Sequence, residues 1–360
     1  MVISMSSDNL DSLLPSSSSN MDDASTTMLS REETAFIRIG MIIGGRYKVE
    51  RFLGRGGMGD VWLASEIEGE QVVQSVVLKI IPYTLQKNSI QLKKFMASFE
   101  LARQLRHPNI CSALTMTKDD TFGYFLVMDY VNGIELSRYQ KRMPGGVFSF
   151  QQTLDILTPI ATSLDYAHKK KIIHRDIKPQ NIMIPFDGET PVIDDLQIID
   201  FGLAMQFHST TTGVDDQFGA TSGTIPFMPP EQINGMRQDA RTDQYSMVVM
   251  AYRMLSGKTP FASKNADEML NRILSEEPPR IEYYSSRVNN VLRRGLAKDR
   301  KMRYSSCTAF LEALRKCEKS AIANSGDTSR KVKTIVFWVI IAIVLLLLIV
   351  LAFISGMRWR

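Results

Sequence analysis

The 360-residue sequence has few cysteines and few histidines, and their scarcity excludes several classes of protein. Its three cysteines, Cys111, Cys307 and Cys317, form no CxxC pair, which argues against a disulfide scaffold or a zinc site and fits a reducing compartment. The four histidines lack metal-ligand spacing. The net charge is only +5 and the basic residues are scattered, so the sequence has no basic stripe of the kind that binds nucleic acid.

The beginning of the chain lacks the features of a secretory signal. Residues 1–34 are rich in Ser, Thr, Asp and Asn, and they contain neither a basic start nor an apolar stretch. Such a composition offers too little apolar surface to offset the entropy of ordering the backbone. We therefore expect residues 1–40 to form a disordered, Ser/Thr-rich segment.

Charged and strongly polar residues are missing from residues 335–354, which read IVFWVIIAIVLLLLIVLAFI. A helix of this length would be about 30 Å long, which matches the hydrocarbon core of a bilayer. The sequence therefore predicts a single C-terminal transmembrane helix over 335–354, with the lipid bilayer as a partner. A juxtamembrane linker over 319–334 would precede it, and a short tail over 355–360 would follow.

The middle of the chain, residues 41–318, changes its pattern once. Short β-rich segments dominate first, and helical spacing prevails from about residue 150 onward. This order predicts an α+β fold with a β-rich N-lobe over about 41–130, a helical C-lobe over about 131–318 and a cleft between them. The predicted strands are 46–53, 59–65, 72–81 and 123–130, and the predicted helices are 90–105, 151–170, 242–257, 266–277 and 305–317.

A glycine-rich segment, GRGGMGDV, follows the first predicted strand and contains Gly54, Gly56, Gly59 and Val61. Glycines let the backbone approach phosphate groups closely because they have no Cβ atom. The same GxGxxG spacing occurs in dinucleotide-binding folds, where a helix begins within the glycines. Here the following residues, DVWLASE, alternate as in a strand, so the glycines close a hairpin and the dinucleotide interpretation is disfavoured.

Two charged residues lie next to or inside apolar strands. Lys79 in VVLKII is costly to bury unless it meets an anion, and the alternative is an edge strand with this lysine in water. Asp200 in LQIIDFGLA directly follows a predicted strand. A carboxylate at a strand end suits a hard divalent metal, and Asn181 offers a neutral oxygen as a second ligand.

The segment IIHRDIKPQN, residues 172–181, mixes charges of both signs in what reads as a shaped loop. Together with the glycine segment, Lys79 and Asp200, it fits phosphoryl transfer, which needs held phosphates, a metal and a carboxylate that orients the attacking hydroxyl. In this interpretation Asp176 accepts the hydroxyl proton and Lys178 offsets charge on the phosphoryl group. The histidine of the segment is expected to pack and hydrogen-bond.

From Tyr47 to Leu314 the sequence resembles the protein kinase superfamily, specifically the bacterial eukaryotic-like (Hanks-type) Ser/Thr protein kinases. Five motifs follow the family's order: the glycine loop, the strand lysine, HRDIKPQN, DFG and GTIPFMPPEQ. The lysine within HRDIKPQN is the form found in Ser/Thr kinases. The resemblance implies a bilobal protein kinase fold, ATP and Mg²⁺ (or Mn²⁺) as cofactors, and protein Ser/Thr hydroxyls as acceptors of the γ-phosphate.

The same resemblance gives roles to individual residues. The catalytic residues would be Asp176, Lys178 and Lys79, and the metal ligands would be Asn181 and Asp200. The segment LVMDYVNG resembles the hinge, with a methionine gatekeeper and backbone contacts to adenine. The residues that would contact ATP are Gly54, Gly56, Gly59, Val61, Val77, Lys79, Met128, Asp129 and Val131. The residues with structural roles would be Arg175, Thr224, Glu231, Asp243 and Arg303.

Some of these structural roles imply particular contacts. Asp243 would brace the catalytic loop from a long helix, and Arg303 would pair with Glu231. Arg175, directly before the catalytic aspartate, resembles the arginine of kinases that are switched on by phosphorylation of the activation loop. The candidate phosphorylation sites are Ser209, Thr210, Thr211, Thr212, Thr221 and Ser222, and the alternative is that this cluster is only a polar flexible loop.

One departure from the family pattern bears on activity. Counting back nine residues from His107 of the HPN motif reaches Ser98, where active kinases carry the glutamate that pairs with the strand lysine. Glu100 lies two residues later and points about 200° away on a helix. Two hypotheses remain: an active Ser/Thr protein kinase, or an ATP-binding pseudokinase that acts as a scaffold.

The resemblance also implies where the protein works and with which partners. ATP is cytoplasmic, so the kinase domain should face the cytoplasm while the predicted span anchors it to the cell membrane. The expected partners are ATP, protein substrates and the bilayer, and not nucleic acid. A homodimer that supports autophosphorylation is compatible with the sequence, although the span contains no GxxxG to support helix pairing.

Overall fold

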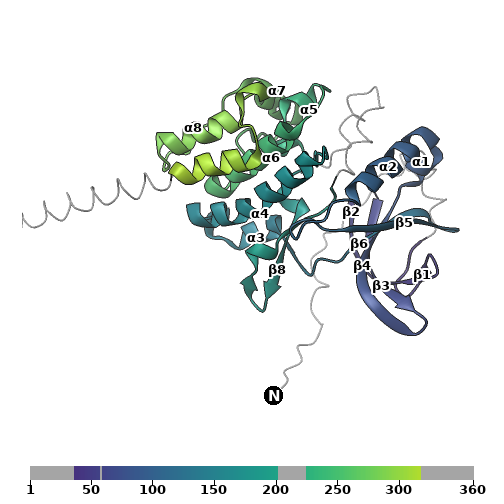
Figure 1. Cartoon of the computed structure of the whole chain (residues 1–360). Coiled ribbons are helices and arrows are strands. Elements are labelled where there is room, and N and C mark those ends of the chain that lie inside the picture. Colours follow the sequence, from purple (N-terminus) through teal and green to yellow (C-terminus); the bar gives the residue numbers. More distant parts are fainter. Residues whose placement is uncertain (1–35, 57–58, 202–223, 318–360) are drawn as a thin grey trace, which may run out of the picture. The chain divides into compact units, whose positions relative to one another are not determined.

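The structure is a computed structural model that describes residues 36–56, 59–201 and 224–317. The architecture belongs to the second of two units, Ile39–Arg360. Within it, a β-rich lobe precedes a helical lobe, as the colours along the chain in Figure 1 show. The predicted bilobal arrangement is therefore confirmed.

The N-lobe is built on a six-stranded antiparallel sheet in the order β1-β2-β3-β4-β6-β5. Two helices, α1 and α2, lie between β4 and β5 in the chain. The strands are β1 (Ile42–Ile43), β2 (Tyr47–Gly56), β3 (Gly59–Glu68), β4 (Gln71–Ile80), β5 (Ala113–Asp119) and β6 (Gly123–Asp129), and the helices are α1 (Tyr83–Lys87) and α2 (Ser89–Ala102).

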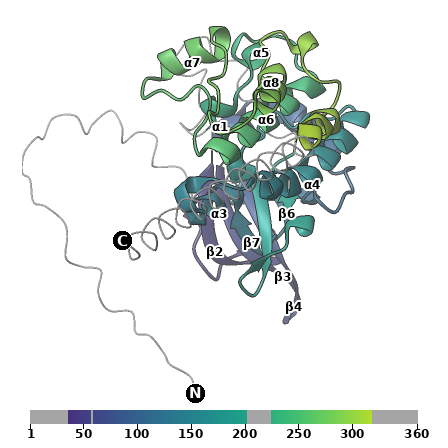
Figure 2. The same ribbon diagram turned by 90° about the vertical axis from the view of Figure 1, so that its left-hand side faces the viewer.

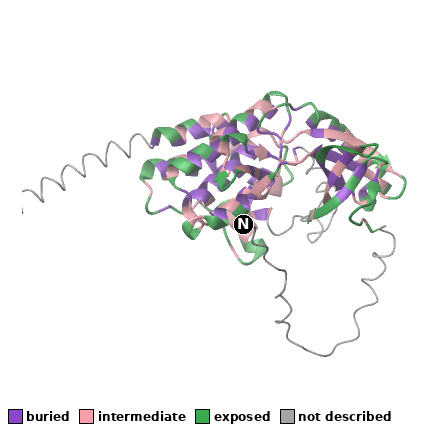
Figure 3. Cartoon of the chain, turned by 90° about the horizontal axis from the view of Figure 1, so that it is seen from below, coloured by how far each residue is buried: buried purple, intermediate pink, exposed green. Residues whose placement is uncertain are grey.

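Strand β4 is buried only along its second half. Its residues 71–75 are exposed, whereas Val76, Val77, Leu78 and Lys79 are buried. Val77 from this half packs in one apolar cluster with Phe95, in the purple interior of the N-lobe in Figure 3. A run of apolar residues at one end of a long strand therefore places a lysine inside the lobe.

A small second sheet, in the order β10-β8-β7 with β9 paired to β8, begins the C-lobe. Its strands are β7 (Gly133–Glu135), β8 (Ile182–Asp187), β9 (Thr190–Pro191) and β10 (Gln197–Ile198). The segment after α2 joins this sheet through a bridge between Ile110 and Ile198. The Asn109 amide also donates to the carbonyls of Asp194 and Leu196, at 2.7 and 2.9 Å, so the two lobes share hydrogen bonds.

The C-lobe helices pack around α6, which is buried along nearly its whole length. In Figure 2 the helices α5 to α8 gather at the top of the view, and strands β2 to β4 lie at the bottom. The helices are α3 (Leu136–Arg142), α4 (Phe150–Lys169), α5 (Pro230–Ile233), α6 (Ala240–Ser256), α7 (Ala266–Ser275) and α8 (Ser286–Gly295), and residues 307–317 are also helical. Short 3-10 turns are η2 (Pro144–Gly146), η3 (Pro179–Asn181), η4 (Ile193–Asp195), η6 (Ile225–Phe227) and η7 (Arg300–Met302).

The two long C-lobe helices begin with capping boxes. Ser149 and Gln152 exchange side-chain and backbone hydrogen bonds at the start of α4, and Asp239 and Thr242 do so at the start of α6. Helix α6 ends at Gly257, whose φ of +80° is the left-handed conformation that favours glycine. Local sequence signals therefore fix where these helices begin and end.

The predicted elements agree with the structure, which also contains elements that were not predicted, among them helices α3 and α8 and strands β7, β8 and β9. Each of the four predicted strands and five predicted helices has a counterpart, and the helix expected over 90–105 is α2, which ends at Ala102. Strand β5 and helix α1 were not predicted. No helix among the described residues is long and apolar enough to cross a membrane, and the span predicted over 335–354 lies outside them.

Candidate active site

The predicted catalytic loop brings its polar side chains together just before strand β8. One carboxylate oxygen of Asp176 accepts hydrogen bonds from Lys178 Nζ at 2.8 Å and from Asn181 Nδ2 at 3.0 Å. Lys178 also donates to Thr224 Oγ1 at 2.7 Å. The side chain of Asp176 remains 19% exposed, so a hydroxyl can approach it.

The backbone of the catalytic loop is hydrogen-bonded to Asp243 on helix α6. This carboxylate is fully buried and accepts the backbone N–H groups of His174 at 2.8 Å and Arg175 at 2.7 Å. Burial alone would raise the pKa of Asp243, but its hydrogen bond with His168 and the nearby positive charges lower it. A buried, ionised carboxylate therefore fixes the backbone directly before Asp176.

The backbone at Arg175 has a φ of +72°, which is unusual for a residue with a side chain. The two hydrogen bonds to Asp243 compensate for this strain by holding the local turn. His174 adds a further constraint, because its Nε2–H donates to the Ile199 carbonyl at 2.8 Å and its Nδ1 accepts the N–H of Asp176 at 3.2 Å. The expected packing role of His174 agrees with these contacts.

Lys79 of the N-lobe and Asp200 of the C-lobe form an ion pair, with Nζ to Oδ1 at 2.9 Å. The lysine side chain is only 6% exposed, so the alternative of an edge lysine in water is wrong. Burial alone would raise the pKa of Asp200, but the charge and hydrogen bond of Lys79 lower it. Asp200 also has a positive φ, +63°, at the start of the DFG segment.

Helix α2 does not bring a glutamate to Lys79. Glu100 is 56% exposed and pairs with Arg103 at 3.2 Å, as its position on the helix predicted. Ser98 is half-buried on another face of the helix. Among the residues that the structure describes, Asp200 is the ion-pair partner of Lys79.

Four of the predicted ATP-contact residues lie on one face of the N-lobe sheet. Val61 is opposite Lys79 in the β3–β4 ladder, and Val77 is opposite Met128 in the β4–β6 ladder. Because alternate residues of a strand share a face, these four side chains form one surface. It is apolar except for the lysine ammonium, which suits a flat base beside a phosphate chain.

The glycine segment closes the β2–β3 hairpin, with Gly56 opposite Gly59 and Gly54 opposite Val61. Gly59 has a φ of +112°, and a Cβ there would lie 1.9 Å from the carbonyl oxygen of Ile80. A side chain is therefore excluded at Gly59. A Cβ at Gly54 would meet nothing within 4 Å, so this glycine leaves open space.

The hinge residues lie at the end of β6 and directly after it. The backbone N–H of Asp129 donates to the Ser112 carbonyl at 3.0 Å, and the Asp129 carbonyl accepts from the Cys111 thiol at 3.3 Å. Val131 is buried beside them. The sequence did not indicate that a thiol reaches this carbonyl.

The two predicted metal ligands are brought together by the small sheet. Strands β8 and β10 pair, and the Ile199 N–H donates to the Asn181 carbonyl at 2.9 Å, next to Asp200. The carboxylate of Asp200 and the amide oxygen of Asn181 are hard oxygen donors that suit Mg²⁺. The residues present therefore fit a divalent cation bound with nucleotide phosphates.

The C-lobe ion pair expected between Arg303 and Glu231 is present. Both guanidinium NH groups of Arg303 bind the carboxylate, each at 2.8 Å, and the Thr242 hydroxyl donates to it at 3.1 Å. Thr224 lies beside Lys178, as described above. The phosphorylation candidates Ser209, Thr210, Thr211, Thr212, Thr221 and Ser222 lie outside the described residues.

Sequence reasoning missed His168 and Asp165 at the end of helix α4. His168 Nε2 lies 2.7 Å from Asp243 Oδ2, and Asp165 accepts the N–H groups of Cys307 and Thr308 at 2.9 and 3.0 Å. The sequence feature that could have indicated them is an aspartate and a histidine three residues apart, at the end of the helix that precedes the catalytic loop. Such a pair faces one side of a helix.

Comparisons with known proteins agree with this geometry. The family described as protein kinase domain matches residues 47–314. The Ser/Thr protein kinase pkn3 of Myxococcus xanthus is 32% identical over 291 residues, covering 78% of this chain and 51% of the relative. The Ser/Thr protein kinase PrkC of Bacillus subtilis is 30% identical over 272 residues, covering 74% of this chain and 40% of the relative.

Among solved structures, the kinase domain of PknI from Mycobacterium tuberculosis matches with a TM-score of 0.59 and 26% identity, covering 78% of this chain and all of that domain. The alignments span about half of the length of the curated relatives named above. The family match covers most of this chain and includes the loop, the lysine and the DFG segment described above. The chain therefore belongs to the protein kinase family and contains a Ser/Thr protein kinase domain of the bacterial type.

Proposed function

We propose that the protein is an active, membrane-anchored Ser/Thr protein kinase that transfers the γ-phosphate of MgATP to protein hydroxyls. The observation that carries this proposal is the cluster of Asp176, Lys178 and Asn181, in which the lysine ammonium and the asparagine amide both lie within hydrogen-bonding distance of the carboxylate. A chain without catalysis would have little chemical need of this cluster together with Lys79 and Asp200.

Each residue of the site has its own role in phosphoryl transfer, set by its position. Asp176 orients the attacking hydroxyl and takes its proton, which requires an oxygen-to-oxygen distance of about 2.6–3.2 Å. Lys178, beside that carboxylate, offsets negative charge on the phosphoryl group during transfer. Asn181 and Asp200 would hold the metal, and Lys79 would hold the nucleotide phosphates. When bound, MgATP supplies the phosphoryl group, whose bond to the leaving oxygen breaks as the bond to the hydroxyl oxygen forms.

A second candidate, an ATP-binding pseudokinase that acts as a scaffold, is favoured by the surroundings of Lys79. Its partner here is Asp200, the carboxylate that the metal requires, and Ser98 stands where a helix glutamate would compete for the lysine. Without a glutamate to bind Lys79, the metal ion alone must draw Asp200 away from the lysine. Catalysis that depends on positioning would then be slower, because Lys79 is less well oriented.

The finer parts of the proposal concern regulation and place. Phosphorylation among Ser209, Thr210, Thr211, Thr212, Thr221 and Ser222 would give Arg175 an anionic partner and order the activation segment. Intact-mass analysis of an active preparation should find added phosphate, and its absence would refute autophosphorylation. The apolar residues 335–354 support anchoring to the cell membrane, with the kinase domain in the cytoplasm where ATP is found.

The decisive experiment measures phosphate transfer from MgATP to a protein acceptor by the full chain and by two variants, Asp176→Asn and Ser98→Glu. We expect wild-type activity, its loss by at least about a thousandfold in Asp176→Asn, and equal or higher activity in Ser98→Glu. No transfer by the wild type, with activity gained in Ser98→Glu, would establish the pseudokinase instead.

A further inference from the structure

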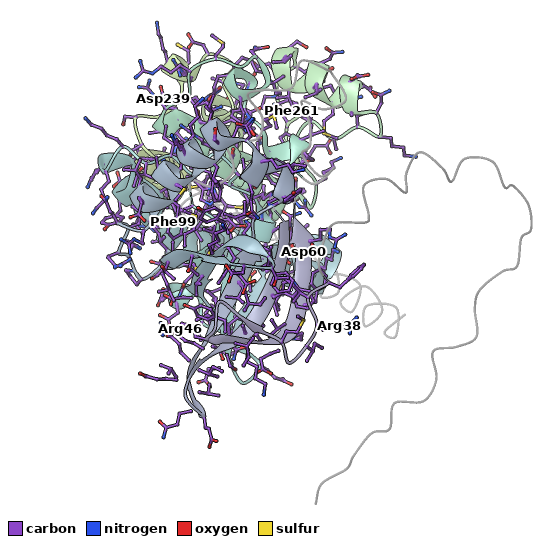
Figure 4. All side chains as sticks on the ribbon, turned by 90° about the vertical axis from the view of Figure 1, so that its right-hand side faces the viewer. Arg38, Arg46, Asp60, Phe99, Asp239 and Phe261 are labelled. Carbon is purple, nitrogen blue, oxygen red and sulfur yellow. The ribbon has the colours of Figure 1, made fainter. Side chains whose placement is uncertain are left out.

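A pocket of about 520 Å³ lies in the C-lobe, away from the ATP-contact surface. Its walls come from the end of α4, the loop that leads into α6, and η7. Figure 4 labels Asp239 of this pocket, which lies in the helical lobe at the opposite end of the view from Arg46 of the β-rich lobe. The polar and charged side chains that line it include those of His168, Lys171, Arg237, Gln238, Asp239 and Arg300.

The pocket wall gathers positive charge from three separate segments. Lys171 and Arg237 are exposed, and neither forms an ion pair with another residue in the described part of the chain. Arg300 lies 3.4 Å from Asp239, whose other carboxylate oxygen caps helix α6 by accepting the Arg241 N–H. The pocket lining therefore contains three permanent cations and one carboxylate, and this excess of positive charge favours an anionic ligand.

The backbone at Lys171 supports a functional reason for this side chain. Lys171 has a φ of +62° just past the end of α4, a position where glycine is the favoured residue. Its N–H closes the turn by donating to the His168 carbonyl at 2.9 Å. A lysine here strains the backbone, so a purely structural turn would be better served by glycine.

Gln238 indicates that the ligand carries more than negative charge. Its side-chain oxygen Oε1 is buried in the pocket wall and has no hydrogen-bond partner among the described residues. A buried acceptor without a donor costs free energy, and a peptide N–H would satisfy it once the Gln238 side chain turns toward the pocket. A free phosphate ion has no peptide N–H, whereas a phosphorylated peptide carries both the phosphate and the N–H donor.

The pocket also touches the support of the catalytic loop. His168 lines it and bonds through Nε2 to Asp243, the carboxylate that holds the N–H groups of His174 and Arg175. A dianionic group beside His168 therefore acts on the same carboxylate that positions the residues before Asp176. Binding here can be sensed at the active site without any contact with ATP.

We propose that this pocket is a docking site for a phosphoserine or phosphothreonine residue within a protein segment, with Lys171, Arg237 and Arg300 binding the phosphate and Gln238 binding the peptide backbone. The proposal rests on the proposed function for the source of the ligand, since a Ser/Thr kinase makes this chemical group. It assigns the site to phosphorylated substrates or products that stay bound after the first transfer.

The test is binding of a short, otherwise uncharged, fluorescein-labelled peptide with one phosphoserine to the full chain, measured by anisotropy without ATP. We expect saturable binding that weakens at least about tenfold in the double variant Lys171→Gln/Arg237→Gln. The charge-matched control Lys264→Gln/Arg293→Gln removes two exposed cations elsewhere in the C-lobe and should bind like wild type. The charge-preserving variant Lys171→Arg/Arg237→Lys should retain binding.

Three results would overturn the proposal: equal binding of the unphosphorylated peptide, unchanged affinity in Lys171→Gln/Arg237→Gln, or displacement by inorganic phosphate at concentrations no higher than the peptide's own. The last would show a simple anion site. The catalytically impaired variant Asp176→Asn should bind the phosphopeptide normally. A wild-type protein that bound the phosphopeptide but transferred no phosphate would therefore refute the proposed kinase function and leave the docking site standing.

Discussion

Arg303 and Glu231 form a salt bridge in which the two side chains are 0% and 5% exposed. Arg303 also donates to the carbonyls of Ala297 and Arg241, so its guanidinium is fully used. Replacing it by alanine would leave a buried carboxylate without its cation. We expect Arg303→Ala to lower the free energy of unfolding by about 3–5 kcal/mol, measured by urea unfolding.

The matched control is another arginine-to-alanine change at an exposed pair. Arg293 lies 3.9 Å from Glu277, and both side chains are more than half exposed. Arg293→Ala should change the free energy of unfolding by no more than about 1 kcal/mol, because water screens and solvates both charges. If the two variants lost equal stability, the buried pair would not support the C-lobe in the way that we describe.

The two glycines of the β2–β3 hairpin are expected to respond differently to the same added methyl group. Gly59→Ala forces a residue with a side chain to a φ of +112° and into the Ile80 carbonyl. Gly54→Ala meets open space. Thermal unfolding without nucleotide should show Gly59→Ala destabilised by at least about 1–3 kcal/mol and Gly54→Ala unchanged or slightly stabilised. Equal effects would contradict the hairpin geometry.

At the scale of elements, the last turn of helix α4 carries a histidine with an unusual acid–base equilibrium. Burial alone would lower the pKa of His168, but the nearby carboxylate of Asp165 and the hydrogen bond and charge of Asp243 raise it from 6.5 to about 9. The folded state therefore binds this proton more tightly than the unfolded state. The resulting stability is fully present below pH 6.5 and is lost as the pH rises to about 9.

We expect this effect in a comparison of wild type with His168→Gln. The difference in the free energy of unfolding between them should shrink by about 2–3 kcal/mol between pH 6.5 and pH 9. A difference is needed because burial lowers the pKa of the partly buried Lys298 to about 8, so its loss of charge raises the stability over part of the same pH range. Parallel stability curves for the two proteins would show that His168 is not held as a cation.

Most elements of the fold were predictable because their local signals agree with their packing. Alternating residues such as those of β3 form strands, and the Ser149 and Asp239 caps mark the starts of α4 and α6. Strand β5 escaped prediction because its residues, ALTMTKD, mix apolar and polar side chains without clear alternation. Its place at the edge of the sheet, beside β6, gives it one neighbour only.

The sequence allowed the residues of the site to be predicted, but only some of the contacts between them. The loop, the lysine and the DFG segment are contiguous motifs, so their identities follow from sequence alone. The ion pair of Lys79 with Asp200 and the bond of His168 to Asp243 join residues that are 121 and 75 positions apart. Such contacts depend on how the two lobes and α6 pack, and periodicity along the chain carries no information on that.

At the scale of the whole molecule, the kinase domain accounts for residues 47–314, and the apolar residues 335–354 need a separate explanation. We predict that they anchor the full chain to membranes. The triple variant Ile343→Asp/Leu346→Asp/Ile349→Asp places three carboxylates near the middle of the span, at about 3 kcal/mol each in a bilayer. It should move the protein from the membrane fraction to the supernatant on ultracentrifugation of cell lysates.

The control for this change keeps the positions and the hydropathy. The variant Ile343→Leu/Leu346→Ile/Ile349→Leu should stay with the membranes, because its apolar surface is unchanged. Both variants leave the active-site residues untouched, so the released triple-aspartate protein should still transfer phosphate to a soluble acceptor. A triple-aspartate protein that remained in the membrane fraction and resisted extraction by high salt would refute residues 335–354 as the anchor. Release together with loss of phosphate transfer would mean that the kinase domain needs the membrane for its activity and not only for its location.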